Sequence, residues 1–168
     1  MQNTPQTNEV GRAGAISAAL MAACHRFGLP FELLELGSSC GLNLNLARYG
    51  YDLGGVLAGA GDSPVQIAPV WTGRSPVSAP FDVVRARGVD LNPLDPGDAP
   101  TRERLLSYVW ADQPARARRL ERAIDLAQRY PPTLDRGDAP SWLAARLAEP
   151  QETGLCRVVF HSMVLQYL

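Results

Sequence analysis

An acidic residue followed by small residues at alternate positions is the feature of this sequence that most suggests chemistry. Glu35 lies near the end of the apolar stretch 31–36, and Gly37, Ser39 and Gly41 follow it. A buried strand that leads through such a turn into a helix places backbone N–H groups at the carboxyl end of a parallel sheet, where α/β proteins bind ligands. We therefore expect a ligand site here, with an ordinary tight turn as the alternative.

Two common phosphate-binding turns fit this spacing poorly. The dinucleotide fingerprint needs a small residue where Leu42 stands, because its third glycine allows close contact between helix and strand. The P-loop needs a lysine, and all sixteen basic residues of the chain are arginines. With both phosphate-binding turns set aside, the carboxylate of Glu35 at the strand end is the remaining candidate for ligand binding.

The acid and the alternating small residues resemble the first motif of class I methyltransferases that use S-adenosylmethionine (SAM), with serine as the middle small residue. SAM carries an ammonium and a sulfonium but no phosphate, so a carboxylate matches it better than a lysine does. The resemblance implies that the methionine part of SAM is held by Glu35, Gly37, Ser38, Ser39 and Gly41.

Two further acids follow predicted strands. Asp90 ends the strand within residues 81–93, and an acid at this point in nucleotide-binding α/β folds hydrogen-bonds ribose hydroxyls. Asp138 precedes a helix and fits two roles. It suits the N-cap of that helix, and the resemblance to methyltransferases implies a contact with the adenine amino group.

His161 follows the stretch 155–160, which predicts another strand. Because the unperturbed pKa of histidine lies near neutrality, His161 is the candidate general base for methyl transfer. A histidine that hydrogen-bonds backbone at a strand end is the alternative. No pair of cysteines or histidines has the spacing of a metal site, so we expect no bound metal.

The elements that position these residues alternate between strand and helix. Apolar stretches predict parallel strands that begin at Phe31, Val83, Thr133 and Leu155, and three-to-four spacing predicts helices over 10–27, 101–110, 114–129 and 140–148. A short helix is also predicted between Gly41 and Gly50, against the alternating pattern of its residues, and Asn43 or Asn45 in its first turns could face the ligand. The pattern predicts a three-layer Rossmann-like fold with strand order three-two-one-four. The fourth strand is then an edge but is too apolar for one. We therefore expect a sheet truncated after its fourth strand, and a chain that forms a homodimer or aggregates through that edge or needs a further C-terminal segment.

Residues 51–80 predict an insertion with a β-hairpin, because they are rich in glycine and proline and 65–71 suits an edge strand. We expect this insertion to lie over the site, with Trp71 closing on a substrate or covering a small core. The domain is predicted over 7–168, after a disordered tail at 1–6. Thr7 or Asn8 is the predicted cap of the helix over 10–27, and the polar cluster Thr7–Glu9 with Arg12 is interpreted as cap and surface charge.

Composition limits the function classes. A chain of 168 residues suits one domain, and its net charge of −1 gives no general attraction to nucleic acid or to anionic membranes. No apolar run approaches the roughly 20 residues that span a bilayer, which favours a cytoplasmic location. The three cysteines are scattered and predict no disulfide framework. Without lysine, Schiff-base chemistry is excluded.

A wider set of segments resembles an uncharacterised bacterial family known as domain of unknown function 2332. The segments are Thr7–Arg12, Leu34–Leu44, Tyr49–Tyr51, Trp71–Gly73, Gly88–Asp95, Tyr108–Gln113, Val159–Ser162 and Gln166–Tyr167. They cover nearly the whole chain. The resemblance implies a class I methyltransferase-like fold but brings no established reaction.

Together these features predict a SAM-dependent methyltransferase-like domain that acts on a small molecule. The Asp/Asn-Pro-Pro-Tyr motif of enzymes that methylate amino groups of nucleic acids is absent from the sequence, which argues against bases as substrates. The alternative is a non-catalytic module that binds SAM or another nucleoside. The sequence favours neither strongly, because methyl transfer can proceed by positioning alone.

Overall fold

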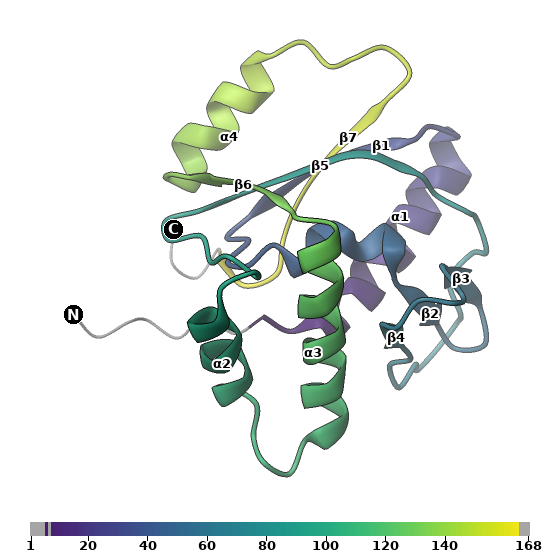
Figure 1. Cartoon of the computed structure of the whole chain (residues 1–168). Helices are drawn as coiled ribbons and strands as arrows, with labels where there is room; N and C mark the ends of the chain where they lie inside the picture. The colour runs from purple at the N-terminus through teal and green to yellow at the C-terminus, as the bar shows by residue number, and fades with distance from the viewer. Residues whose placement is uncertain (1–5, 7, 165–168) are drawn as a thin grey trace.

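A computed structural model describes residue 6 and residues 8–164, and Figure 1 shows its path in chain order. The tail predicted at 1–6 lies outside the described residues except for Gln6. Thr7 and the family-like segment Gln166–Tyr167 lie outside them as well. No helix in the described part of the chain is long and apolar enough to cross a membrane.

Within the described residues, four parallel strands form the main sheet in the order β6-β5-β1-β7. The inner strands are β1 (Phe31–Leu36) and β5 (Val83–Asp90), and the outer strands are β6 (Thr133–Arg136) and β7 (Cys156–His161). This is the predicted order three-two-one-four. Because the strands are parallel, their carboxyl ends lie along one edge of the sheet, where the predicted site residues follow them.

Helices cover the two faces of this sheet unequally. One face carries α1 (Ala13–Phe27), α2 (Ala99–Ser107) and α3 (Pro114–Arg129), whereas α4 (Ala139–Ala148) lies on the other face (Figure 1). A 3-10 helix, η2 (Leu42–Arg48), follows the turn after β1. The predicted three-layer, Rossmann-like α/β arrangement is therefore confirmed.

The main core lies between the sheet and the α1 side. Its fully buried members include Leu20, Phe31, Leu33, Leu46 and Ile124. A much smaller cluster lies under α4 and contains Leu36, Val89 and Ala139. Side chains alternate along a strand, so Leu33 and Leu36 of β1 face opposite cores.

The start of the first helix differs from the prediction. A short 3-10 helix, η1 (Val10–Arg12), precedes α1, and its cap is Glu9 rather than Thr7 or Asn8. Oε1 of Glu9 accepts a hydrogen bond from the N–H of Gly11 at 2.9 Å. A carboxylate is suited to this position because it accepts from the unpaired N–H groups of a helix start.

The insertion forms a small second sheet in the order β3-β2-β4. In it β2 (Gly50–Asp52) pairs antiparallel with β3 (Leu57–Gly59) and parallel with β4 (Gln66–Ile67). The predicted hairpin and edge strand are therefore confirmed, although β4 has only two residues.

The expectation that the insertion lies over the site is wrong. Leu53 and Ile67 are buried and pack where Gly14 of α1 leaves room, because a β-carbon at Gly14 would lie 3.3 Å from Ile67 Cγ2. Burial of these apolar side chains holds the insertion against α1. Trp71 covers Gly54, packs against the main core and donates from Nε1 to the carbonyl of Arg74 at 3.1 Å, which is the core-covering role.

Candidate functional site

The turn after β1 is built onto the end of β5. The N–H groups of Gly37 and Ser38 donate to the carbonyl of Val89 at 2.9 and 3.0 Å. The N–H of Ser39 donates to Oδ2 of Asp90 at 2.8 Å. Left-handed backbone at Gly37 (φ 68°) and at Ser39 (φ 51°) makes the chain reverse sharply here. Asp90 therefore fixes the turn, which sequence reasoning did not predict.

The N-terminal segment closes the turn from its other side. Asn8 donates from Nδ2 to Oγ of Ser39 at 2.9 Å, and its Oδ1 accepts from the N–H of Cys40 at 3.3 Å. The N–H of Gly41 donates to the carbonyl of Ser38 at 2.7 Å. All five N–H groups of the turn thus have acceptors within the protein, which differs from the free groups expected from the sequence.

Asp90 stands at the end of β5, as predicted, but other donors already meet its carboxylate. Oδ1 accepts from the N–H of Asn92 at 2.8 Å and from Nε2 of Gln6 at 3.2 Å. Gln6 donates also to the carbonyl of Asn92 at 3.1 Å. A ribose hydroxyl at this carboxylate would compete with the side chain of Gln6.

Glu35 is a buried acid. Its side chain is only 2% exposed, and it points to the face of β1 that carries η2. Asn43 of η2 donates from Nδ2 to Oε1 of Glu35 over a long 3.5 Å, while Oε2 has no partner among the described residues. Burial raises the pKa of Glu35 to about 8; Asp90 also raises it, while Asn43 and Arg12 lower it.

Arg12 brings a positive charge to this end of the sheet. It is half-buried at the end of η1, and its Nη1 donates to Oγ of Ser162, just after β7, at 3.1 Å. Sequence reasoning missed Arg12 as a site residue because it interpreted the cluster Thr7–Glu9 with Arg12 as cap and surface charge. One sequence feature could have identified Arg12 as a site residue: it is an arginine beside polar residues at the start of an otherwise apolar helix.

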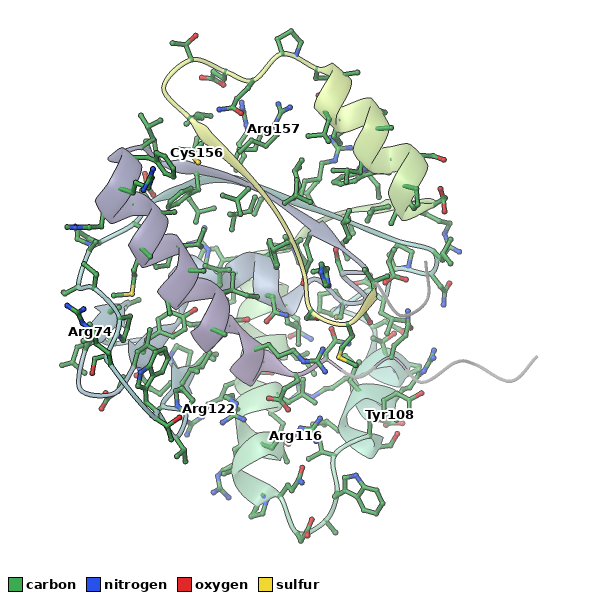
Figure 2. The ribbon with its side chains drawn as sticks, turned by 180° about the vertical axis from the view of Figure 1, so that it is seen from behind. Arg74, Tyr108, Arg116, Arg122, Cys156 and Arg157 are labelled. Carbon is green, nitrogen blue, oxygen red and sulfur yellow. The ribbon has the colours of Figure 1, made fainter. Side chains whose placement is uncertain are left out.

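Glu9 anchors the same N-terminal segment to α3. Its carboxylate forms ion pairs with Arg116 and, at 3.3 Å, with Arg119. Figure 2 labels Arg116 where α3 passes close to the start of α1. These contacts hold Asn8 and Arg12 in place on either side of Glu9.

Two predicted site residues lie apart from this cluster. In the register of the sheet His161 stands beside Leu36, so its exposed side chain lies on the α4 face, opposite the face of Glu35. Asp138 caps α4, where its Oδ2 accepts from the N–H of Ser141 at 3.0 Å and from Oγ of Ser141 at 2.8 Å. The cap role of Asp138 is confirmed, and its adenine contact stays a prediction.

A groove of about 390 Å³ lies on the α4 face, and none of the predicted site residues lines it. Four arginines line it, and each has a carboxylate partner: Arg85, Arg87, Arg146 and Arg157. Figure 2 shows Arg157 on the side of β7 that faces α4. Because these charges are compensated within the protein, the groove is a structural ion-pair layer rather than a candidate site.

The residues that converge at the carboxyl end of the sheet are named the Glu35 site, and they comprise Glu35, Asn43, Arg12, Ser39 and Asp90. They come from β1, the turn after it, η2, η1 and β5. Gly37, Ser38 and Gly41 shape the turn beside them. The sequence predicted Glu35, Ser39 and Asp90, left the role of Asn43 open and missed Arg12.

Comparison with family models matches residues 1–168 to a family described as "Uncharacterized protein conserved in bacteria (DUF2332)". Comparisons with curated proteins and with solved structures found no match. The resemblance suggested by the sequence segments is therefore confirmed at the level of this family.

Proposed function

Because the chain belongs to this uncharacterised bacterial family (DUF2332), which brings no reaction with it, we propose a function from the Glu35 site: the domain binds SAM and transfers its methyl group to a small molecule. One observation carries the proposal. A buried carboxyl at the carboxyl end of a central strand has an oxygen without a partner among the described residues. An ionised carboxylate is stable in such a place only with a positive partner.

SAM supplies that partner and, when bound, an electrophilic methyl group. Glu35 would hold the methionine part, beside the turn Gly37 to Gly41, whose N–H groups already donate within the protein. Asp90 would hold the ribose, once Gln6 yields its place on Oδ1. Asp138 would meet the adenine from its position after β6. The residues present therefore fit SAM, because the Glu35 carboxylate can pair with a positively charged group of SAM.

In this proposal the chain accelerates transfer by orientation. The protein holds donor and acceptor in line and keeps water from them, and this alone supplies a large part of a barrier reduction. His161 lies on the α4 face, so we assign it no role at Glu35. The acceptor is a small molecule that arrives already nucleophilic, such as an amine or a thiol.

A non-catalytic module that binds SAM or another nucleoside is the second candidate. The observation that favours it is the tight closure of the turn by Asn8 and the occupation of Asp90 by Gln6. A site closed by its own N-terminal segment suits slow ligand exchange better than turnover.

Calorimetric titration of the purified chain with SAM, with NAD as control, tests the proposal. We expect SAM to bind and NAD not to bind. SAM labelled in its methyl group is then incubated with the protein and a cell extract, and small-molecule, protein and nucleic-acid fractions are counted. Label in the small-molecule fraction supports transfer; SAM binding without label transfer favours the module. Failure to bind SAM overturns methyl transfer and a SAM-binding module, and it leaves only a module for another nucleoside.

A further inference from the structure

The Glu35 site contains a buried acid, Glu35, and an arginine, Arg12, and among the described residues neither forms an ion pair. Oε2 of Glu35 and Oδ1 of Asn43 are buried acceptors without a donor among the described residues. Arg12 donates to the Ser162 hydroxyl, and the described part of the chain gives it no ion pair. The charge of Arg12 nevertheless reaches Glu35 and lowers its pKa.

The two buried acceptors are neighbours. Asn43 contacts Glu35 through its Nδ2, and their side chains are 9% and 2% exposed. Buried acceptors are normally satisfied, so two of them together indicate a donor that arrives with a ligand. A primary ammonium fits best, because it brings three N–H donors and a positive charge to a carboxylate and an amide oxygen.

Arg12 fits the other end of such a ligand. A guanidinium is planar and binds a carboxylate through two parallel N–H groups. Ser162 occupies only one of its five donors and orients the guanidinium from the loop after β7. An ammonium site and a carboxylate site at one end of the sheet match a single molecule that carries both groups.

We propose that the Glu35 site recognises an α-amino-acid group as a zwitterion, with Glu35 and Asn43 on its ammonium and Arg12 on its carboxylate. The inference rests on the proposed function in that SAM contains such a group. It goes further in assigning Arg12 and Asn43, which lie outside the turn motif, and in naming the chemistry that selects the ligand.

Titration with four probes tests this: L-methionine, L-methioninol, which lacks the carboxylate, 2-hydroxy-4-(methylthio)butanoate, which lacks the ammonium, and SAM. For the wild-type chain we expect both truncated probes to bind at least tenfold more weakly than methionine. Arg12→Gln should abolish the preference over methioninol, and Glu35→Gln the preference over the hydroxy acid. Arg118→Gln, at an exposed position of α3, should leave both preferences unchanged.

The outcomes separate the two proposals. Methionine binding with both preferences, but no SAM binding, keeps the zwitterion site and removes the SAM function. SAM binding with methioninol and the hydroxy acid as tight as methionine overturns the zwitterion site alone. Binding of neither methionine nor SAM overturns both. If Arg12→Gln does not fold, Arg12→Lys, which keeps the charge but not the planar fork, should lose most of the preference over methioninol; an unchanged preference contradicts the assignment.

Discussion

The carboxylate of Asp90 accepts a hydrogen bond from the backbone N–H of Ser39 at 2.8 Å, and this bond ties the end of β5 to the turn after β1. The same carboxylate accepts from Asn92 and from Gln6 of the N-terminal segment. One side chain thus fixes the turn and meets the segment that closes it. Any role of Asp90 in ligand binding is coupled to the stability of the turn.

Asp90→Asn should therefore lower the free energy of unfolding by about 1–3 kcal/mol, because the amide replaces one accepting oxygen by a donor and leaves an N–H unpaired. Urea denaturation of the variant, beside the exposed control Asp112→Asn, measures this. Equal stability of the two variants, with weaker binding of adenosine only to Asp90→Asn, would show that Asp90 serves the ligand and not the turn.

The sequence predicted the strand order and the acid-glycine turn because both follow from local pattern. Apolar stretches, glycine positions and connection lengths determine which segments become parallel strands and where they end. Glu35 and Asp90 were found for this reason, since each stands at a strand end. Even the helix after Gly41, now the 3-10 helix η2, was predicted against the alternating pattern of its residues.

The rest depends on register and on distant contacts. His161 pairs with Leu36 in the sheet, and this register determines on which face of the sheet its side chain lies. No local sequence pattern predicts that register. Arg12 meets Ser162 across 150 positions, and Gln6 meets Asp90 across 84. The insertion packs against α1 at Gly14, whose neighbours Leu53 and Ile67 only the folded chain reveals.

The buried acid should make stability depend on pH. Because the folded pKa of Glu35 is about 8 and its ordinary value is 4.5, the folded chain keeps a proton that the unfolded chain releases. Stability therefore falls as pH rises from 4.5 to 8. In Glu35→Gln this loss is absent, so the variant should gain on the order of 3 kcal/mol relative to wild type between pH 4.5 and pH 7.

Urea denaturation at a series of pH values checks this expectation, with Glu103→Gln at an exposed position as the matched control. The control should follow the wild-type profile throughout. Parallel profiles for wild type and Glu35→Gln would mean that Glu35 ionises normally in the folded chain, and that its free oxygen meets water or another donor.

Gly88 of β5 should tolerate no side chain. A β-carbon there would lie 2.0 Å from Oγ of Ser38, whose hydroxyl donates to the carbonyl of Glu35 at 3.0 Å. Gly88→Ala should cost about 1–3 kcal/mol of stability by overpacking. Adding Ser38→Gly should recover part of this loss, whereas Gly61→Ala, which meets nothing within 4 Å, should change little. Additive losses in the double variant would refute the contact.

The outer strand β7 should promote association. In the described part of the chain β7 pairs only with β1, and Val159 on it is 39% exposed. An edge without an outward charge invites another strand, and the charge of Arg157 is bound to Glu32 at 2.6 Å. We expect a concentration-dependent dimer in sedimentation velocity that Val159→Lys abolishes and Leu147→Lys on α4 does not. A monomer at every concentration would contradict this.

Titration of the Glu35 carboxyl by carbon-13 NMR tests the central claim most directly, with Glu35→Gln identifying its resonance. Without ligand, we expect this carboxyl to titrate near pH 8, because its burial disfavours the charged form. With saturating SAM or methionine, the midpoint should fall below pH 7, because a positive group next to the carboxylate favours its charged form. A midpoint near 4.5 without ligand, or one that a saturating ligand leaves in place, would contradict a cation-binding role for Glu35.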